Sequence, residues 1–73
     1  MARRTVDYSA FLKRLRRARQ HAGISQEEAG RRLGKPQSYV SKCESGERRV
    51  DVVELMAFAR IYGVPINFFY GSV

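Results

Sequence analysis

Four glycines, at positions 23, 34, 46 and 63, divide the chain into short segments. The segment before Gly23 has the clearest pattern, because its apolar residues recur at three- and four-residue steps from Tyr8 to Ala22. Such spacing is typical of an amphipathic helix, and glycine suits the left-handed position just past a helix end. The chain is therefore restricted to short helices joined by tight turns, and no alternating strand pattern competes with this interpretation.

Capping residues mark where the helices begin. Asp7 precedes the first apolar stripe, and Ser25 with Glu28 predicts a capping box in which each side chain satisfies a backbone N–H group. Asp51 and Glu54 repeat that arrangement before the longest apolar segment. The sequence predicts five helices, the third and fifth opened by proline, at about 8–22, 26–33, 36–44, 52–62 and 65–70.

The chain has 73 residues, which leaves room for one hydrophobic core, so we expect a single domain over 1–73. Cys43 is the only cysteine, which excludes an internal disulfide and favours the reducing cytoplasm. No Cys/His pair has metal-ligand spacing, and no nucleophile–base–acid set, paired carboxylates or phosphate-binding glycine loop is present. We therefore expect no metal, no cofactor and no enzymatic activity.

Fourteen Lys and Arg residues against seven Asp and Glu give a net charge of +7, which favours a polyanionic partner. Half of the basic residues lie within 1–22, and we expect residues 1–6, with Arg3 and Arg4, to form a flexible basic arm. Binding of the first helix to an anionic membrane is disfavoured because its apolar face is needed for the core. No apolar run approaches the roughly 20 residues of a bilayer span, so nucleic acid is the favoured partner.

The stretch 26–45 contains two predicted helices joined by a tight turn at Gly34. Helices joined so closely must cross steeply, which requires a small residue where they approach and apolar residues on their facing sides. Gly30 supplies the small residue. The predicted facing set is Ala29, Leu33, Val40 and Cys43.

Several fragments occur together in one order and spacing: Arg19, Gly23-Ile24-Ser25-Gln26-Glu27-Glu28, Leu33-Gly34, Gln37-Ser38, Val40, Glu44-Ser45-Gly46, Phe58-Ala59 and Tyr62-Gly63-Val64. With these features the sequence resembles the XRE-type helix-turn-helix family of phage repressors and Cro proteins, over about residues 8–70. The resemblance implies an all-α, compact five-helix bundle, a lambda-repressor-like DNA-binding domain with its motif at about 25–45. Lys35, Ala29 and Cys43 depart from the family's usual apolar or bulkier residues, which predicts modest stability.

The same resemblance implies roles for individual side chains on double-stranded DNA. Helix 36–44 is the recognition helix, whose first residues face base edges in the major groove. Gln26 contacts phosphate and supports Gln37, and Arg19 forms a structural ion pair with Glu44. The predicted base contacts are Gln37, Ser38, Tyr39, Lys42 and Arg48, and the predicted phosphate contacts are Gln26, Lys35, Ser41, Ser45 and Arg49.

The last two predicted helices carry more large apolar side chains than one small core hides. Because a single motif contacts few base pairs, we expect them to form a homodimer interface, with the residues Met56, Ile61, Phe68, Phe69 and Tyr70. The predicted function is a transcriptional regulator, most simply a repressor. Two alternatives remain open: an antitoxin or other protein-interaction module that represses its own operon, with a toxin or other protein as partner, and a restriction-modification controller.

Overall fold

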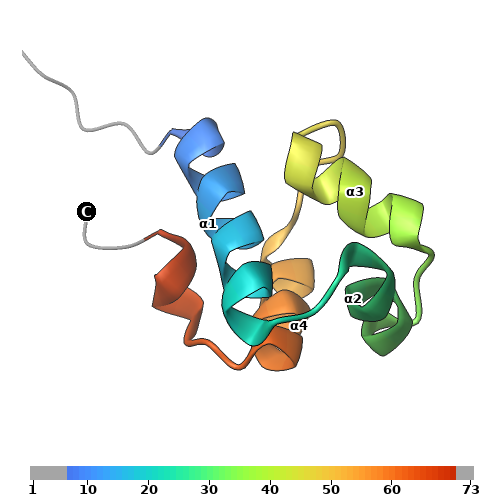
Figure 1. Cartoon of the computed structure of the whole chain (residues 1–73). Coiled ribbons are helices and arrows are strands. Elements are labelled where there is room, and N and C mark those ends of the chain that lie inside the picture. Colours follow the sequence, from blue (N-terminus) through green and yellow to red (C-terminus); the bar gives the residue numbers. More distant parts are fainter. Residues whose placement is uncertain (1–6, 71–73) are drawn as a thin grey trace, which may run out of the picture.

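The computed structural model describes residues 7–70, in which every regular element is a helix and no strand occurs. The predicted arm at 1–6 lies outside the described residues. Figure 1 shows α2 and α3 side by side at one end of the molecule, with α1, α4 and the last turn forming the other part. The elements are α1 (Tyr8–Ala22), α2 (Gln26–Leu33), α3 (Gln37–Ser45), α4 (Val52–Tyr62) and a short 3-10 helix, η1 (Ile66–Phe69).

The all-α fold class is confirmed, although the count of α-helices is four and the predicted fifth helix is a 3-10 turn. Its hydrogen bonds span three residues: the Phe68 N–H donates to the Pro65 carbonyl at 2.9 Å, and the Tyr70 N–H donates to the Asn67 carbonyl at 3.3 Å. A segment of four residues is too short to gain much from the four-residue spacing of an α-helix.

Side chains cap the starts of three helices, but only one predicted capping box is complete. Asp51 Oδ1 accepts from the Glu54 N–H at 2.8 Å, and Glu54 Oε1 accepts from the Asp51 N–H at 2.9 Å. Ser25 Oγ accepts from the Glu28 N–H at 3.0 Å, whereas the Glu28 carboxylate turns to Arg31 and Arg32. The reciprocal bond predicted for Glu28 was wrong, because two guanidinium groups on the next turn are stronger partners than a neutral N–H.

The turn between α2 and α3 depends on two glycines. Gly34 has φ 71°, the left-handed conformation that ends α2. One residue later the Lys35 N–H donates to the Gly30 carbonyl at 2.8 Å. A Cβ atom at Gly30 would lie 2.7 Å from the Lys35 carbonyl oxygen and 3.1 Å from that of Pro36, closer than side-chain carbons approach backbone. The predicted close approach of the two helices is thus present, and it leaves no room for a side chain.

The core joins all five elements. Tyr39 of α3 stacks on Phe58 of α4 with ring centroids 6.3 Å apart, and Phe58 stacks on Tyr62 at 5.7 Å. Phe69 inserts from η1 beside Phe11 of α1. The buried hydrophobic residues are Leu15, Ala18, Ala29, Val40, Cys43, Phe58, Ala59, Tyr62 and Phe69. Three of the four predicted facing residues of α2 and α3 are among them, and the fourth, Leu33, packs against the cluster.

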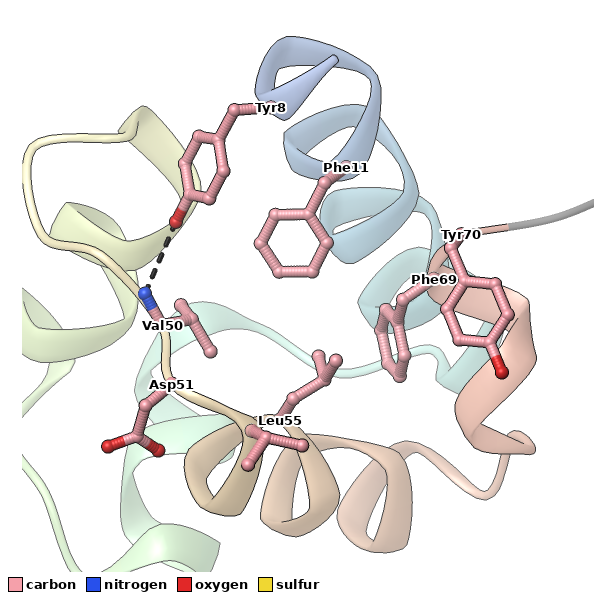
Figure 2. A pocket seen from close by; sticks show the side chains of 8 residues that line it. Tyr8, Phe11, Val50, Asp51, Leu55, Phe69 and Tyr70 are labelled. Atoms are coloured by element: carbon pink, nitrogen blue, oxygen red, sulfur yellow. Dashed lines mark hydrogen bonds between the residues drawn. The ribbon is translucent and has the colours of Figure 1, made fainter. Parts of the chain in front are cut away.

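An apolar pocket of about 300 Å³ opens between the start of α1, the loop before α4, and η1. Figure 2 shows Phe11, Leu55 and Phe69 pointing into it, with Tyr8 and Tyr70 at its sides. The Tyr8 hydroxyl accepts a hydrogen bond from the Val50 N–H at 3.2 Å and so links the loop to α1.

None of the described helices has both the length and the apolar character needed to cross a bilayer.

The close contact at Gly30 can be tested by substitution, because helix propensity and steric clash predict opposite changes in the free energy of unfolding. Helix propensity alone predicts that Gly30→Ala stabilises α2 by about 1 kcal/mol. The clash with backbone at 2.7 Å predicts the opposite, a loss of about 1–3 kcal/mol. Urea unfolding measures the change, and Gln20→Ala on the exposed side of α1 is the control for an ordinary surface change. An unchanged or higher midpoint for Gly30→Ala would contradict the close approach.

Candidate nucleic-acid interface

The first turn of α3 presents polar side chains to solvent. Gln37 and Ser38 are exposed, and Lys42 is exposed one turn after Ser38 on the same side. The opposite side of α3 is buried through Val40 and Cys43. Ser41, predicted to contact phosphate, is half-buried. The helix therefore has one side fixed in the core and a narrow polar stripe that is free for a partner.

A hydrogen bond ties Gln37 to the neighbouring helix. Its Nε2 donates to Oε1 of Gln26, the first residue of α2, at 2.7 Å. Gln26 Nε2 in turn donates to Glu44 Oε1 at 3.0 Å. The two glutamines that the sequence predicted to act together are brought together, and the bond from Gln26 to Glu44 was not anticipated.

Glu44 is a buried carboxylate whose side chain is only 1% exposed. Arg19 Nε donates to its Oε2 at 2.6 Å, and Arg19 Nη2 donates to its Oε1 at 3.2 Å. Arg19 Nη1 donates to the Ile24 carbonyl at 3.0 Å, and the hydrogen bond to Glu44 raises the pKa of Arg19 above its ordinary value. Arg16 Nε lies 3.7 Å from Oε1. The ion pair expected from the sequence therefore exists and links α1 to the end of α3.

Tyr39 is half-buried and its ring packs within the protein, so its predicted base contact stays a prediction. Its ring stacks on Phe58, and burial raises the pKa of Tyr39 to about 12. The Lys35 ammonium lies 5.3 Å from the centre of the same ring, where a cation is attracted to the aromatic face. Lys35 itself is exposed, and its predicted phosphate contact stays a prediction.

Arg48 was predicted to read a base, but its guanidinium is already engaged within the protein. It lies 4.8 Å from the centre of the Tyr39 ring, Nη2 pairs with Glu54 Oε2 at 2.8 Å, and Nη1 donates to the Arg49 carbonyl at 3.1 Å. The hydrogen bond to Glu54 raises the pKa of Arg48. Arg48 therefore fixes the loop between α3 and α4, and its predicted base contact stays a prediction.

The remaining loop residues lie where α3 ends. Ser45 Oγ donates to the Lys42 carbonyl at 3.2 Å and accepts from the Glu47 N–H at 3.3 Å, so it closes the turn. Arg49 is exposed, and its guanidinium lies 4.3 Å from the centre of the Tyr8 ring. Ser45 follows Lys42 by three residues at the end of α3, and the phosphate contacts of Ser45 and Arg49 stay predictions.

The predicted dimer residues fall into three groups. Met56 and Tyr70 are 55% and 44% exposed, Ile61 and Phe68 are half-buried, and Phe69 is 1% exposed. Phe69 as a dimer anchor was wrong, because its ring completes the protein's own core against Phe11.

Sequence reasoning missed three contributors to these surfaces. Val52 and Val53 are exposed beside Met56, and the unusual density of apolar residues at the start of α4 was the signal for them. Glu54 was predicted only as a capping residue, although its carboxylate also pairs with Arg48, and nothing in the local sequence indicates that pair.

Cys43 is buried as predicted, and burial raises the pKa of its thiol. Residues 7–70 contain no cluster of three or more potential metal ligands.

Comparison with known proteins shows which family and which individual proteins this chain is similar to. The profile of a family described as "Helix-turn-helix domain" matches residues 10–67. Two proteins described as uncharacterized HTH-type transcriptional regulators, from Sinorhizobium medicae (strain WSM419) and Rhizobium meliloti (strain 1021), are each 37% identical over 57 residues, which is 78% of this chain. The chain spans 41% of the length of these curated relatives.

A solved structure gives the corresponding likeness in three dimensions. It is an XRE-family like protein from Pseudomonas syringae pv. tomato str. DC3000, 50% identical, with a TM-score of 0.79. The match covers 85% of this chain and 76% of that one.

The Arg48–Glu54 contact predicts a dependence of stability on pH. The hydrogen bond from Arg48, with that from the Asp51 N–H, lowers the pKa of Glu54 to about 2, from an ordinary value of about 4.3. Ionised Glu54 therefore stabilises the fold fully above about pH 4.3, and this contribution is lost as the pH falls toward 2. Glu54→Gln should lower the free energy of unfolding at neutral pH by about 1 kcal/mol.

Urea unfolding of both proteins between about pH 2 and 7 checks this prediction. The difference between wild type and Glu54→Gln should shrink below about pH 4, whereas Glu47→Gln, an exposed change in the loop that contains Arg48, should give no such trend. A difference that stays constant over the whole range would contradict the pairing.

Proposed function

The chain belongs to the XRE-type helix-turn-helix family, and on that premise we propose that it is a sequence-specific DNA-binding transcriptional regulator. We propose further that it acts as a repressor and reads the major groove of double-stranded DNA with α3, as a homodimer. The regulator description of its relatives supports the first part, and the surface chemistry described above supports the reading by α3 and the homodimer.

The observation that carries the proposal is the polar first turn of α3, exposed and yet anchored. Gln37 is solvent-facing while its amide is held by Gln26 at 2.7 Å. A side chain fixed in this way loses little conformational entropy on binding, which favours specific readout. Gln37 suits adenine N6 and N7, Ser38 donates or accepts, and Lys42 suits guanine O6 or N7.

Charge and the flanking residues supply the contacts to the DNA backbone. Gln26, Lys35, Ser41, Ser45 and Arg49 are the proposed phosphate ligands. The net charge of +7 supports long-range attraction to DNA that does not depend on sequence. In this proposal base identity rests on few side chains, so affinity and specificity come from different parts of the surface.

Homodimerisation is proposed through the exposed apolar side chains at the start of α4 and the end of η1. Met56 and Tyr70 remain from the sequence prediction, and the exposed Val52 and Val53 adjoin them. Val52 also lines the open apolar pocket. Apolar side chains gathered in this way mark a contact surface, and two copies would read two half-sites about one helical turn apart.

A second candidate function is a protein-interaction module, such as an antitoxin, that uses the same apolar surface for a different partner. The exposure of Val52, Val53 and Met56 favours it. A restriction-modification controller is a variant of the first proposal, since it also belongs to the DNA-binding class. The oligomeric state of the purified chain separates the dimer from the interaction module.

Replacing Gln37 tests base readout. After selection of bound duplexes from a random DNA pool, Gln37→Ala should weaken binding to the selected site by about 1–3 kcal/mol while sparing binding to unrelated DNA. The reason is that alanine removes a base contact and leaves the phosphate contacts in place. Fluorescence anisotropy with both duplexes measures the two affinities.

Arg49→Gln is the matched control, because it removes a proposed phosphate contact. It should weaken binding to both duplexes alike and reduce the slope of log affinity against log salt by about 0.9. Equal losses for Gln37→Ala on both duplexes would demote Gln37 to a role in general binding. A pool that yields no enriched sequence with the wild-type protein would contradict the proposed function itself.

Placing a charge on the proposed dimer surface tests the homodimer. Met56→Asp should shift the protein to monomer and weaken binding to a two-half-site duplex, because a carboxylate cannot be buried there unpaired. Sedimentation over a range of concentrations gives the oligomeric state, and Gln20→Asp on α1 is the exposed control. A wild-type chain that is monomeric at every concentration, with and without DNA, would overturn the homodimer and favour a protein partner.

A further inference from the structure

We propose that Glu44 is a positioning residue that sets which base Gln37 prefers, acting through Gln26. This inference rests on the proposed function, because it assumes that Gln37 reads a base. Three consecutive contacts carry it: Gln37 Nε2 to Gln26 Oε1 at 2.7 Å, Gln26 Nε2 to Glu44 Oε1 at 3.0 Å, and Arg19 Nε to Glu44 Oε2 at 2.6 Å.

The direction of this chain of hydrogen bonds is fixed at its buried end. A carboxylate only accepts hydrogen bonds, whereas a glutamine amide both donates and accepts. Gln26 must therefore turn its NH₂ group toward Glu44, which leaves its oxygen facing Gln37. Gln37 must then turn its own NH₂ group toward Gln26. The charge on Glu44, two side chains away, thus sets the orientation of the exposed amide.

That orientation determines what Gln37 offers to a base. One Nε2 proton is used by Gln26, so one N–H donor and the Oε1 acceptor remain for the groove. This pair matches adenine, which has an acceptor at N7 and a donor at N6. Guanine has acceptors at both N7 and O6, so Oε1 would face another oxygen. The geometry therefore favours adenine over guanine at the position read by Gln37.

Replacing Glu44 by glutamine should reverse the chain. Arg19 Nε makes the shortest contact, to Oε2 at 2.6 Å, and would keep the new amide oxygen at that place, whereas the longer contact from Arg19 Nη2 to Oε1 at 3.2 Å would be lost. The new NH₂ group would then occupy the place of Oε1 and face Gln26, whose oxygen would turn toward it. Gln26 would offer its NH₂ to Gln37, Gln37 would accept with Oε1, and two N–H donors would face the groove. That donor pair suits guanine N7 and O6.

The test uses the full chain and a duplex selected by the wild-type protein from a random pool, with adenine or guanine at the position that Gln37→Ala identifies. The wild-type protein should prefer adenine by about tenfold, and Glu44→Gln should abolish or invert that preference. Glu28→Gln is the matched control, because Glu28 pairs with Arg31 and Arg32 on α2, outside the relay. It should retain the wild-type preference.

A second variant separates positioning from loss of stability. Gln26→Met interrupts the relay while leaving the Arg19–Glu44 pair in place, and it should also reduce the preference for adenine. In the Gln26→Met background, Glu44→Gln should then change the preference no further, because Glu44 no longer communicates with Gln37. A purely structural Glu44 would instead lower binding to both duplexes by the same factor in either background.

Side-chain NMR of the DNA-free protein gives an independent readout. The Gln37 NH₂ resonances should move in Glu44→Gln and in Gln26→Met but not in Glu28→Gln. Unmoved resonances, or an adenine preference that survives Glu44→Gln in a folded protein, would overturn the relay while leaving DNA binding by Gln37 intact. If no position of the selected duplex responds to Gln37→Ala, base readout by Gln37 fails and the relay's role in base choice fails with it.

Discussion

One buried carboxylate holds the first three helices together. Glu44 comes from α3, and it accepts hydrogen bonds from Arg19 of α1 and Gln26 of α2. A charge with so little exposure costs several kcal/mol unless it is paired, so the fold that contains Glu44 requires both partners in place. The guanidinium of Arg19 also reaches the Ile24 carbonyl, which joins the connection between α1 and α2 to the same point. The arrangement of α3 relative to the rest of the protein depends on this junction.

The second constraint is the contact at Gly30, where the backbone of α2 meets the start of α3 without an intervening side chain. Together with Glu44 at the other end of α3, it fixes both ends of that helix. The stack of Tyr39 on Phe58 fixes its middle. A helix held at three points presents its first turn as a rigid surface, which is what selective recognition of bases requires. The geometry of the polar stripe therefore depends on buried residues that do not themselves contact a partner.

Local features of the sequence were sufficient to predict where the α-helices begin and end. Glycines and capping residues act within a few positions, so the four α-helices begin and end within a residue of their predicted bounds. The predictions fell short where a side chain's contacts come from elements that are distant in the sequence. The contacts that Tyr39 and Arg48 make within the protein were not foreseen, because their partners, Phe58 and Glu54, lie on α4. Phe69 was assigned to a dimer because its place in the core depends on how η1 folds back. The glutamine pair was predictable from the resemblance to known regulators, whereas its link to Glu44 required the three-dimensional arrangement.

In the proposed function, the first turn of α3, held in place by the buried contacts of that helix, is the surface that meets DNA. Titration of the isotopically labelled chain with a selected duplex, followed by NMR, tests it most directly. We expect the largest changes in the backbone and side-chain resonances of Gln37, Ser38 and Lys42, with smaller changes at Gln26 and Arg49. Saturating binding that leaves the α3 resonances unchanged would contradict it.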